Sequence, residues 1–286
     1  MISYFNKTTR PKVVELGGKG YSLTMLTTAG FNVPKGFVLV AKAFDEYLRL
    51  NTLKSDISKI LLEINESNFR EKSREARNLI HKGDISEELA DEVRKGLINI
   101  NVPYLSIRSS AVSEDNATFS LAGAFDTYLN INSELDIVLS NIKNCWASLL
   151  NERAVLYKLK KRIPLLEGMA VVIQKMISAI VSGVTFTSYP LLENRMVIEA
   201  SYGAGDILVS GRVNPDSYQI NQTTLEIVEK SLVEEQTLQD NEIQKIAKEC
   251  MEIEKVFSAP QDIEWCIDKN GLWILQSRPI TKTQSV

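Results

Sequence analysis

The chain has 286 residues, of which 44% are hydrophobic and 24% charged, and its 33 basic and 36 acidic residues give a formal net charge of -3. Such a composition is that of a globular protein, and the length allows a large core in one domain or in two lobes. The balance of charges excludes an electrostatic case for binding nucleic acid or an anionic membrane surface.

Targeting signals and cysteine usage bear on where the protein resides. The N-terminal MISYFNKTTR lacks the apolar stretch of a signal peptide, and no run of residues approaches transmembrane length. The three cysteines, Cys145, Cys250 and Cys266, lie far apart and show no metal-ligand spacing, which favours reduced thiols in a core. We therefore expect a soluble, cytoplasmic protein that binds neither nucleic acid nor membrane.

The sequence contains one histidine, His81, within the polar helical stretch RNLIHKGDISEELADEV. General acid–base or zinc chemistry built on several histidines is therefore excluded. Lysine, arginine and carboxylate side chains must carry any chemistry that the protein performs.

In chain order, the first elements predict an α/β arrangement. GGKG (17–20) opens a predicted helix, and VPKGFVLV (33–40) is a predicted strand. Helices with one charged face extend from about Ala43 to Asn99, and SIRSS (106–110) then predicts the end of a strand.

The rest of the chain predicts short strands, two helices and a hairpin. One helix runs from roughly Ser133 to Lys161 and another from about Asn241 to Phe257. The predicted strands are DTYLNI, MAVVIQKMI, VSGVTFTS, RMVIEASYG and SYQINQTTLEIVEKSL. We predict two α/β lobes, residues 1–175 and residues 176–286, with their junction near 174–179.

The closing stretch PQDIEWCIDKNGLWILQSRPIT (260–281) predicts a hairpin, because apolar and polar residues alternate before a Gly-containing turn at 268–271. Glu264 and Gln276 would place a carboxylate and an amide oxygen on adjacent strands, which suffices for a Mg2+ ion that keeps waters and phosphate oxygens. Arg278 would lie on the same face as Gln276. The alternative is a surface ion pair between Glu264 and Arg278.

Two further segments could contact a nucleotide. In GGKG, glycines let backbone amides approach an anion, the helix N-terminus adds positive potential, and Lys19 adds a mobile charge; a tight turn is the alternative. VVIQKMI (171–177) is an apolar strand interrupted by Gln174 and Lys175. It predicts either a buried strand with a polar end or an interlobe strand whose backbone and Gln174 side chain contact an adenine edge.

SIRSSAVSEDNATFSLAGAF (106–125) could form a phosphate cover. Arg108 stands at a strand end, the hydroxyls of Ser109 and Ser110 follow, and small residues continue to Gly123. Arginine suits this role because its planar fork meets phosphate oxygens in a bidentate fashion. The alternative is an ion pair of Arg108 with a carboxylate at 114 or 115.

Seven motifs occur in the order found in a known family, and the similarity runs from about Asn6 to Thr281. The chain resembles the ATP-binding domain of the phosphoenolpyruvate synthase and pyruvate phosphate dikinase family, which includes rifampicin phosphotransferase. The motifs are GGKGYSLTML, IRSSAVSED, LAGAFDTYLN, VVIQKMI, IEASYGAGDILVSGRVNPDSY, PQDIEWCID and ILQSRPIT.

The resemblance implies an ATP-grasp-like α/β fold in which two lobes clamp ATP. It implies that Lys19 and Arg108 contact phosphates and act in catalysis, and that the loop through Ser120 and Gly123 covers those phosphates. This chain has Ala124 and Phe125 where the family usually has Gln after the glycine, and it has Asn-Ala-Thr at 116–118 in place of the usual Leu-Pro-Asp. Backbone contacts from the loop could survive both changes.

The resemblance also assigns an adenine and a ribose contact. Gln174, Met176 and the neighbouring backbone would contact the adenine. Glu199, in VIEASYG, would contact the ribose or a lysine.

The hairpin and the phosphoryl acceptor complete what the resemblance implies. Glu264 and Gln276 would bind Mg2+, and Arg278 would stabilise the transferring phosphoryl group. Full-length family members carry a histidine that accepts this group, whereas His81 stands in no such motif and is expected to be a solvated helical residue. The expected acceptor is therefore a phosphohistidine-bearing domain or protein acting in trans.

Three functions remain open from the sequence. The first is an ATP-dependent phosphotransferase subunit or domain, and the second is an ATP-responsive binding module without transfer activity. The third is an ATP-grasp ligase that acts through an acyl phosphate, which the family-specific motifs disfavour.

Overall fold

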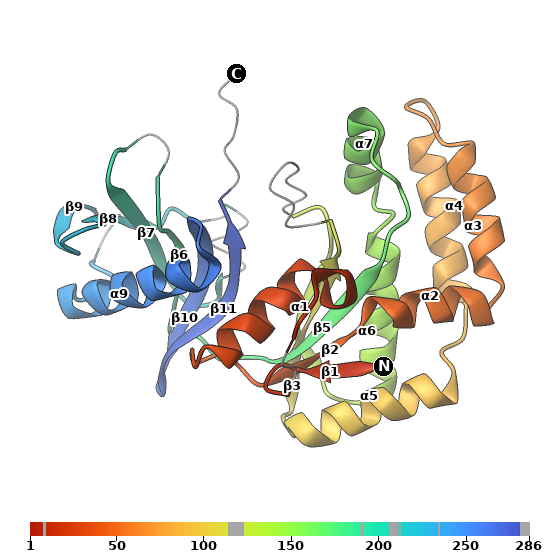
Figure 1. The fold of residues 1–286 in the computed structure, drawn as a ribbon, viewed down its shortest axis with the longest axis horizontal. Helices are drawn as coiled ribbons and strands as arrows, with labels where there is room; N and C mark the ends of the chain where they lie inside the picture. The colour runs from red at the N-terminus through yellow and green to blue at the C-terminus, as the bar shows by residue number, and fades with distance from the viewer. Residues whose placement is uncertain are drawn as a thin grey trace. The chain divides into compact units, whose positions relative to one another are not determined.

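The structure is a computed structural model, and it describes residues 1–7, 10–113, 123–189, 192–205, 211, 213–233 and 235–280. The chain forms two compact units (Figure 1). Unit 1 comprises Met1–Thr24 and Lys35–Met176, and unit 2 comprises Met25–Pro34 and Ile177–Val286. The division into functional lobes at 175/176 stays a prediction.

Unit 1 is built on a five-stranded sheet in the order β1-β2-β5-β3-β4, with antiparallel pairing throughout. The strands are β1 (Ile2–Tyr4), β2 (Gly36–Leu39), β3 (Tyr104–Ala111), β4 (Thr127–Asn132) and β5 (Met169–Lys175). Every segment read as a strand in this part of the sequence forms one, because local alternation and β-branched content suffice to specify it.

The helices of unit 1 confirm the helical stretch before β3. They are α1 (Val13–Thr28), whose last residues from Met25 on belong to unit 2, and α2 (Ala41–Leu50), α3 (Leu53–Leu62), α4 (Phe69–Lys82), α5 (Glu87–Ile100), α6 (Leu135–Ser148) and α7 (Glu152–Lys161). None of the helices that the structure describes combines the length and apolar character needed to cross a membrane.

The single helix predicted for 133–161 is wrong, because the chain breaks between α6 and α7. Asn151 adopts an extended conformation at the N-cap of α7, with φ -60° and ψ 144°. Its side chain donates to the Asp126 carboxylate at 2.8 Å and accepts from Arg77 at 3.2 Å. These partners are remote in sequence, so the helical periodicity could not reveal the break.

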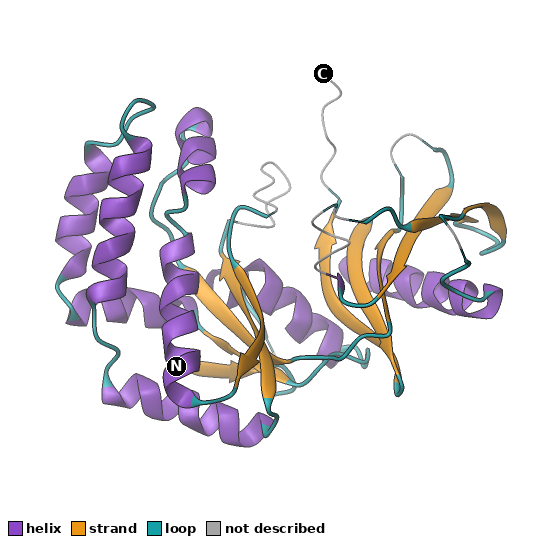
Figure 2. Ribbon diagram, turned by 180° about the vertical axis from the view of Figure 1, so that it is seen from behind, coloured by secondary structure: helices purple, strands orange, loops and turns teal. Residues whose placement is uncertain are grey.

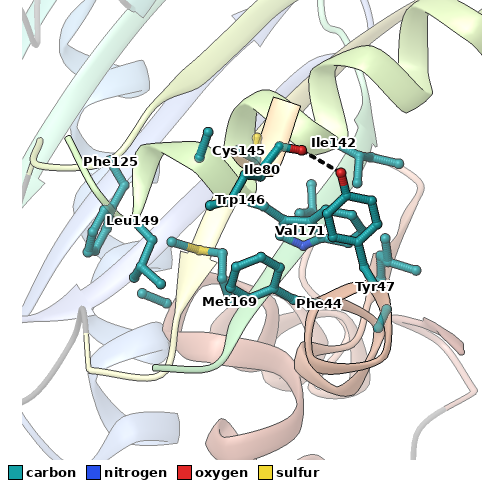
Figure 3. Packing of buried hydrophobic residues seen from close by; sticks show 14 of the residues in the cluster. Phe44, Tyr47, Ile80, Phe125, Ile142, Cys145, Trp146, Leu149, Met169 and Val171 are labelled. Atoms are coloured by element: carbon teal, nitrogen blue, oxygen red, sulfur yellow. Dashed lines mark hydrogen bonds between the residues drawn. The ribbon is translucent and has the colours of Figure 1, made fainter. Parts of the chain in front are cut away.

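Aromatic rings form the centre of the unit 1 core, where side chains of α2, α4 and α6 meet (Figure 3). Trp146 lies 5.4 Å from Phe44 and 4.8 Å from Tyr47, measured between ring centroids. The Tyr47 hydroxyl donates to the Ile80 carbonyl, which joins α2 to α4.

Unit 2 contains a six-stranded antiparallel sheet in the order β11-β10-β6-β7-β8-β9, and α9 (Asp240–Phe257) lies across one of its faces (Figures 1 and 2). Ile198, Ile263 and Trp265 of the sheet share a buried cluster with Ile246 and Cys250 of α9. The strands are β6 (Val181–Phe186), β7 (Arg195–Tyr202), β8 (Asp216–Asn221), β9 (Ile227–Ser231), β10 (Gln261–Asp268) and β11 (Gly271–Pro279). The predicted closing hairpin and the helix before it are confirmed.

A glycine in α5 gives a test of the unit 1 packing. A methyl group at Gly96 would lie 2.4 Å from Cε1 of the buried Phe37 ring. Gly96→Ala should therefore lower stability by about 1–3 kcal/mol through overpacking, although alanine favours helix by about 1 kcal/mol over glycine. Thermal melts would measure this. Asn99→Ala at an exposed position of the same helix is the control and should leave the melting temperature unchanged or higher; a higher melting temperature for Gly96→Ala would contradict the packing.

Candidate active site

The GGKG segment stands at a kink in α1, where two helical segments meet at Gly17. The helix begins at Val13 and is interrupted at Gly17, whose φ of 66° and ψ of 175° are not helical. A Cβ atom at Gly17 would lie 2.0 Å from the Ser110 carbonyl oxygen, so glycine is required both by conformation and by the close approach. The residues after Gly17 begin the second of the two helical segments in α1, so the prediction that GGKG opens a helix is confirmed, whereas the short helical segment before Gly17 was not predicted.

Strand alternation in unit 1 gathers polar side chains on the sheet face opposite the aromatic core. Arg108 and Ser110 alternate with Ile107 and Ser109 on β3, and Ile107 belongs to the core. By register, Gln174 of β5 pairs with Ser106 and shares the Arg108 face. Arg108 is 8% exposed and Gln174 is 2% exposed, so the strand's polar end is buried.

Lys19 follows the break in α1 and packs near this face. Gly20, the next residue, approaches Val38 of β2, whose side chain is on the Arg108 face because Val38 pairs with Val172 and Val172 pairs with Arg108. Lys19 is 7% exposed. The structure therefore brings three of the predicted residues, Lys19, Arg108 and Gln174, to one side of the unit 1 sheet.

The two serines after Arg108 donate hydrogen bonds to backbone carbonyls of the protein itself. The Ser109 hydroxyl donates to the Asp126 carbonyl at 2.7 Å, and the Ser110 hydroxyl donates to the Leu16 carbonyl at 2.9 Å. Both residues are fully buried. A direct hydroxyl contact with phosphate, which the sequence suggested, is not the role that these hydrogen bonds give them.

The predicted phosphate loop is only partly described. Ser120 and the carboxylates at 114 and 115 lie outside the described residues. Gly123 has a φ of 67°, and its carbonyl accepts a hydrogen bond of 3.1 Å from Arg153 of α7. Ala124 and Phe125, where the sequence departs from the family, are buried in the unit 1 core. Their burial is consistent with the expectation that the loop contacts a ligand through its backbone.

A buried ion pair anchors the chain at the end of β3. The Lys158 ammonium contacts the Glu167 carboxylate, which also accepts hydrogen bonds of 2.8 and 2.7 Å from the Ser113 amide and hydroxyl. Burial lowers the pKa of Lys158, and the Glu167 charge opposes that shift. Sequence reasoning did not single out this pair, because its partners are separated in sequence and neither stands in a chemical motif.

Two other residues complete the unit 1 description. The Met176 amide donates to the Tyr104 carbonyl at 3.0 Å, so this backbone position is held at the end of β5. Thr127 of β4, which sequence reasoning missed, lies directly opposite Arg108 and is exposed. The alternation of DTYLNI would have indicated its face, but not its pairing with Arg108.

In unit 2, the hairpin register places the predicted residues side by side. Glu264 pairs directly with Gln276, and Asp262 pairs directly with Arg278. These four side chains project away from α9, because the alternate residues, including Ile263, pack in the apolar cluster. The prediction that Gln276 and Arg278 share a face is confirmed.

Glu199 belongs to the same polar face. It pairs with Val184 of β6, and Val184 pairs with Glu264 of β10, so the two carboxylates lie in one row with a single strand between them. Burial raises the pKa of Glu199, and the charge of Asp262 raises it further. Three carboxylates, Glu199, Asp262 and Glu264, therefore create a negative face.

Arg278 is fixed by Asp262, which sequence reasoning missed. Its Nε and Nη2 atoms donate to Asp262 Oδ2 at 2.8 and 2.5 Å. Asp262 is 7% exposed, and its Oδ1 is buried without a hydrogen-bond partner within the described part of the chain. Burial raises the pKa of Asp262, the Arg278 charge opposes this, and Glu264 adds to it. The ion pair seen here joins Arg278 to Asp262, a partner that the sequence did not suggest.

The hairpin residues fit a hard cation. Directly paired residues of an antiparallel sheet have Cβ atoms about 4.5–5.5 Å apart, so the Glu264 carboxylate and the Gln276 amide can approach one ion. Both offer oxygen ligands, which Mg2+ prefers. Among the described residues, no group of three or more His, Cys, Asp or Glu is placed to hold a metal. This donor set suits an ion that takes its other ligands from water and phosphate.

Comparison with known proteins defines the family. Residues 13–237 and 228–286 match the family described as "Pyruvate phosphate dikinase, AMP/ATP-binding domain", and the chain belongs to this family. The antiparallel sheets of both units agree with the ATP-grasp-like α/β class predicted from the sequence.

Several curated relatives cover nearly the whole chain. A probable phosphoenolpyruvate synthase of Methanocaldococcus jannaschii is 33% identical over 98% of this chain and 26% of its own length. Phosphoenolpyruvate synthase of Pyrococcus furiosus is 31% identical over 98% of this chain and 44% of its own length. Rifampicin phosphotransferase of Bacillus cereus is 33% identical over 97% of this chain and 35% of its own length. The chain thus spans less than half the length of these relatives.

Solved structures give a weaker likeness. A D-alanine–D-alanine ligase from Coxiella burnetii aligns with 93% of this chain and 49% of its own, at 10% identity and a TM-score of 0.38. A likeness of this size is too slight to define fold or function.

The raised pKa of Glu199 predicts a pH-dependent stability. A carboxyl whose pKa is higher in the folded chain stabilises the fold fully below its unfolded value, about 4.3, and loses that contribution as pH rises through the folded value. At neutral pH the charged Glu199 is therefore unfavourable, so Glu199→Gln should raise the melting temperature by about 1–2 °C. Scans from about pH 4.5 to 7.5 should show this gain shrinking towards acid. Glu193→Gln, at an exposed site, is the control; a gain that is absent at neutral pH or grows towards acid would contradict the assignment.

Proposed function

We propose that the chain is an ATP-dependent phosphotransferase subunit or domain, which binds ATP with Mg2+ and passes a phosphoryl group to a histidine on a separate domain or partner protein. Enzymes of the phosphoenolpyruvate synthase and pyruvate phosphate dikinase type act in this way. The strongest support is the family match, because residues 13–286 contain every residue proposed for the site. A cytoplasmic location is part of the same proposal.

Unit 1 would bind the nucleotide's phosphates and base. Lys19 and Arg108 would donate charge-assisted hydrogen bonds to phosphate oxygens, with Arg108 presenting two donors in a fixed plane. The backbone at Gly123 would cover the phosphates, and Ser120 is retained in this role from the sequence. Gln174 and the backbone at Met176 would contact the adenine; Gln174 is buried near the end of β5, and the half-buried Met176 directly follows that strand.

Unit 2 would supply the groups that act on the transferring phosphoryl group. Glu264 and Gln276 would hold Mg2+, which when bound neutralises phosphate charge and orients the phosphates for transfer. Arg278 would donate to the phosphoryl oxygens as negative charge develops, and Asp262 would keep its guanidinium in place. Glu199 would contact the ribose or a lysine.

His81 is not proposed as the acceptor. It lies in the last turn of α4, on a helix that carries none of the proposed site residues. Burial lowers its pKa, and the charges of Arg77 and Lys143 lower it further. If His81 retained label after incubation with labelled ATP, and acid removed that label, the proposed transfer to another domain or protein would be contradicted.

Removing the phosphate-binding cations should weaken nucleotide binding. A charge-assisted hydrogen bond contributes roughly 1.5–3 kcal/mol, so Lys19→Ala and Arg108→Ala should each weaken MgATP binding about tenfold or more. Titration calorimetry on the purified chain measures this directly. Lys12→Ala, just before α1, and Arg94→Ala, in α5, remove exposed cations; they are matched controls and should bind like the wild type. The proposal would be contradicted if the wild-type chain showed no binding at millimolar ATP, because a millimolar dissociation constant corresponds to a binding free energy of only roughly 4 kcal/mol.

Changing the hairpin residues should separate transfer from stability. Glu264→Gln and Arg278→Ala should reduce phosphoryl transfer to a histidine-bearing partner by roughly 10²-fold or more, because each removes a group that acts on developing charge. Glu264→Gln should melt near the wild type, since the Glu264 side chain is partly exposed. Arg278→Ala should melt somewhat lower, because it leaves the buried Asp262 carboxylate without its ion-pair partner. Glu229→Gln on the edge strand β9 is the control. Near-wild-type transfer by Glu264→Gln would contradict the proposed metal site. If the wild-type chain transferred no phosphoryl group to its cognate partner, the alternative of an ATP-responsive binding module would be favoured.

A further inference from the structure

The break in α1 is filled by a side chain from β3. In a regular helix, the amide of Gly20 would donate to the carbonyl of Leu16, four residues earlier. Here the Ser110 hydroxyl stands between them: it accepts from the Gly20 amide at 3.0 Å and donates to the Leu16 carbonyl at 2.9 Å. One oxygen atom therefore replaces one rung of the helix.

The replaced rung encloses the Lys19 turn. Leu16 and Gly20 are its two ends, and Gly17, Gly18 and Lys19 lie between them. Gly17 leaves the helical region at φ 66° and ψ 175° and touches the Ser110 carbonyl. A side chain inserted into the hydrogen-bond ladder is a recognised cause of a sharp bend in a helix. The path of the backbone that carries Lys19 is thus set by Ser110.

Ser110 also stands at a fixed step from Arg108. The two residues alternate on β3 and project to the same face, about 6.6–6.8 Å apart along the strand. Ser110 is fully buried, and both hydrogen bonds of its hydroxyl are internal, so its position is closely determined. The hydroxyl ties the turn that carries Lys19 to the strand that carries Arg108.

We propose that Ser110 is a positioning residue for phosphate binding, which holds the Lys19 ammonium at the distance from Arg108 that one phosphate group requires. This inference rests on the proposed function, in which both cations bind the phosphates of ATP. Without the hydroxyl, the Gly20 amide and the Leu16 carbonyl can bond directly. The segment then relaxes towards a regular helix and carries Lys19 away from Arg108.

The direct test is Ser110→Ala, measured by titration with MgATP. Affinity should fall by roughly threefold to tenfold, and by no more than the loss in Lys19→Ala, because the hydroxyl acts through that lysine. Ser148→Ala is the matched control, since the Ser148 hydroxyl is also buried in unit 1 and donates to a backbone carbonyl, that of Cys145, at 2.7 Å. It should lower the melting temperature to a similar degree and leave ATP affinity unchanged.

A double-mutant cycle separates positioning from a general loss of structure. In the Lys19→Ala background, Ser110→Ala should cause no further loss of affinity, because nothing remains to be positioned. A loss that adds fully to that of Lys19→Ala would overturn the proposal, as would wild-type affinity in Ser110→Ala. If Ser110→Ala does not fold, Ser110→Cys keeps the side-chain volume but makes weak hydrogen bonds and takes its place in the cycle.

The outcomes also distinguish this inference from the proposed function. Weaker binding by Lys19→Ala together with normal binding by Ser110→Ala would overturn the positioning role alone. Normal binding by Lys19→Ala, or no binding by the wild-type chain, would overturn both. Loss in Ser110→Ala that disappears in the Lys19→Ala background would support both.

Discussion

Alternation of side chains across an antiparallel sheet is the constraint on which the candidate residues of each unit depend. In unit 1, Ile107 enters the apolar core while Arg108 faces the opposite side, towards the polar end of β5. In unit 2, Ile263 packs under α9 while Asp262 and Glu264 face away from it. A shift of register by one residue would exchange the two faces, burying charge and exposing the core. The free energy gained by burying the apolar face therefore fixes the strand register, and with it the side of the sheet on which the polar residues lie.

The two polar faces differ in charge. The unit 1 face carries Lys19 and Arg108, which suit anionic phosphates, whereas the unit 2 face carries Glu199, Asp262 and Glu264, which suit a cation. Burying these carboxylates opposes folding, as the raised pKa values of Glu199 and Asp262 indicate. Arg278 offsets part of that cost by pairing with Asp262. Such local instability is expected where groups are arranged for a ligand rather than for the fold alone.

Local patterns in the sequence predicted much of this arrangement. The hairpin was predictable because alternation and a glycine turn lie within one short stretch, and the face shared by Gln276 and Arg278 follows from their spacing. The break at Gly17 and the insertion of Ser110 were not predictable, because they join segments about ninety residues apart. The Asp262–Arg278 pair was likewise not predictable, because it depends on the register between β10 and β11. The break after α6 depends on hydrogen bonds of Asn151 with Asp126 and Arg77, which are remote in sequence.

The central claim is that the chain binds MgATP through these two polar faces. Hydrogen exchange of the purified chain, with and without MgATP, tests both faces in one measurement. The account predicts slower exchange of backbone amides in the α1 turn at 16–20, along β3, and in the hairpin formed by β10 and β11. Unchanged exchange in all three segments at saturating MgATP, or protection confined to other parts of the chain, would contradict it.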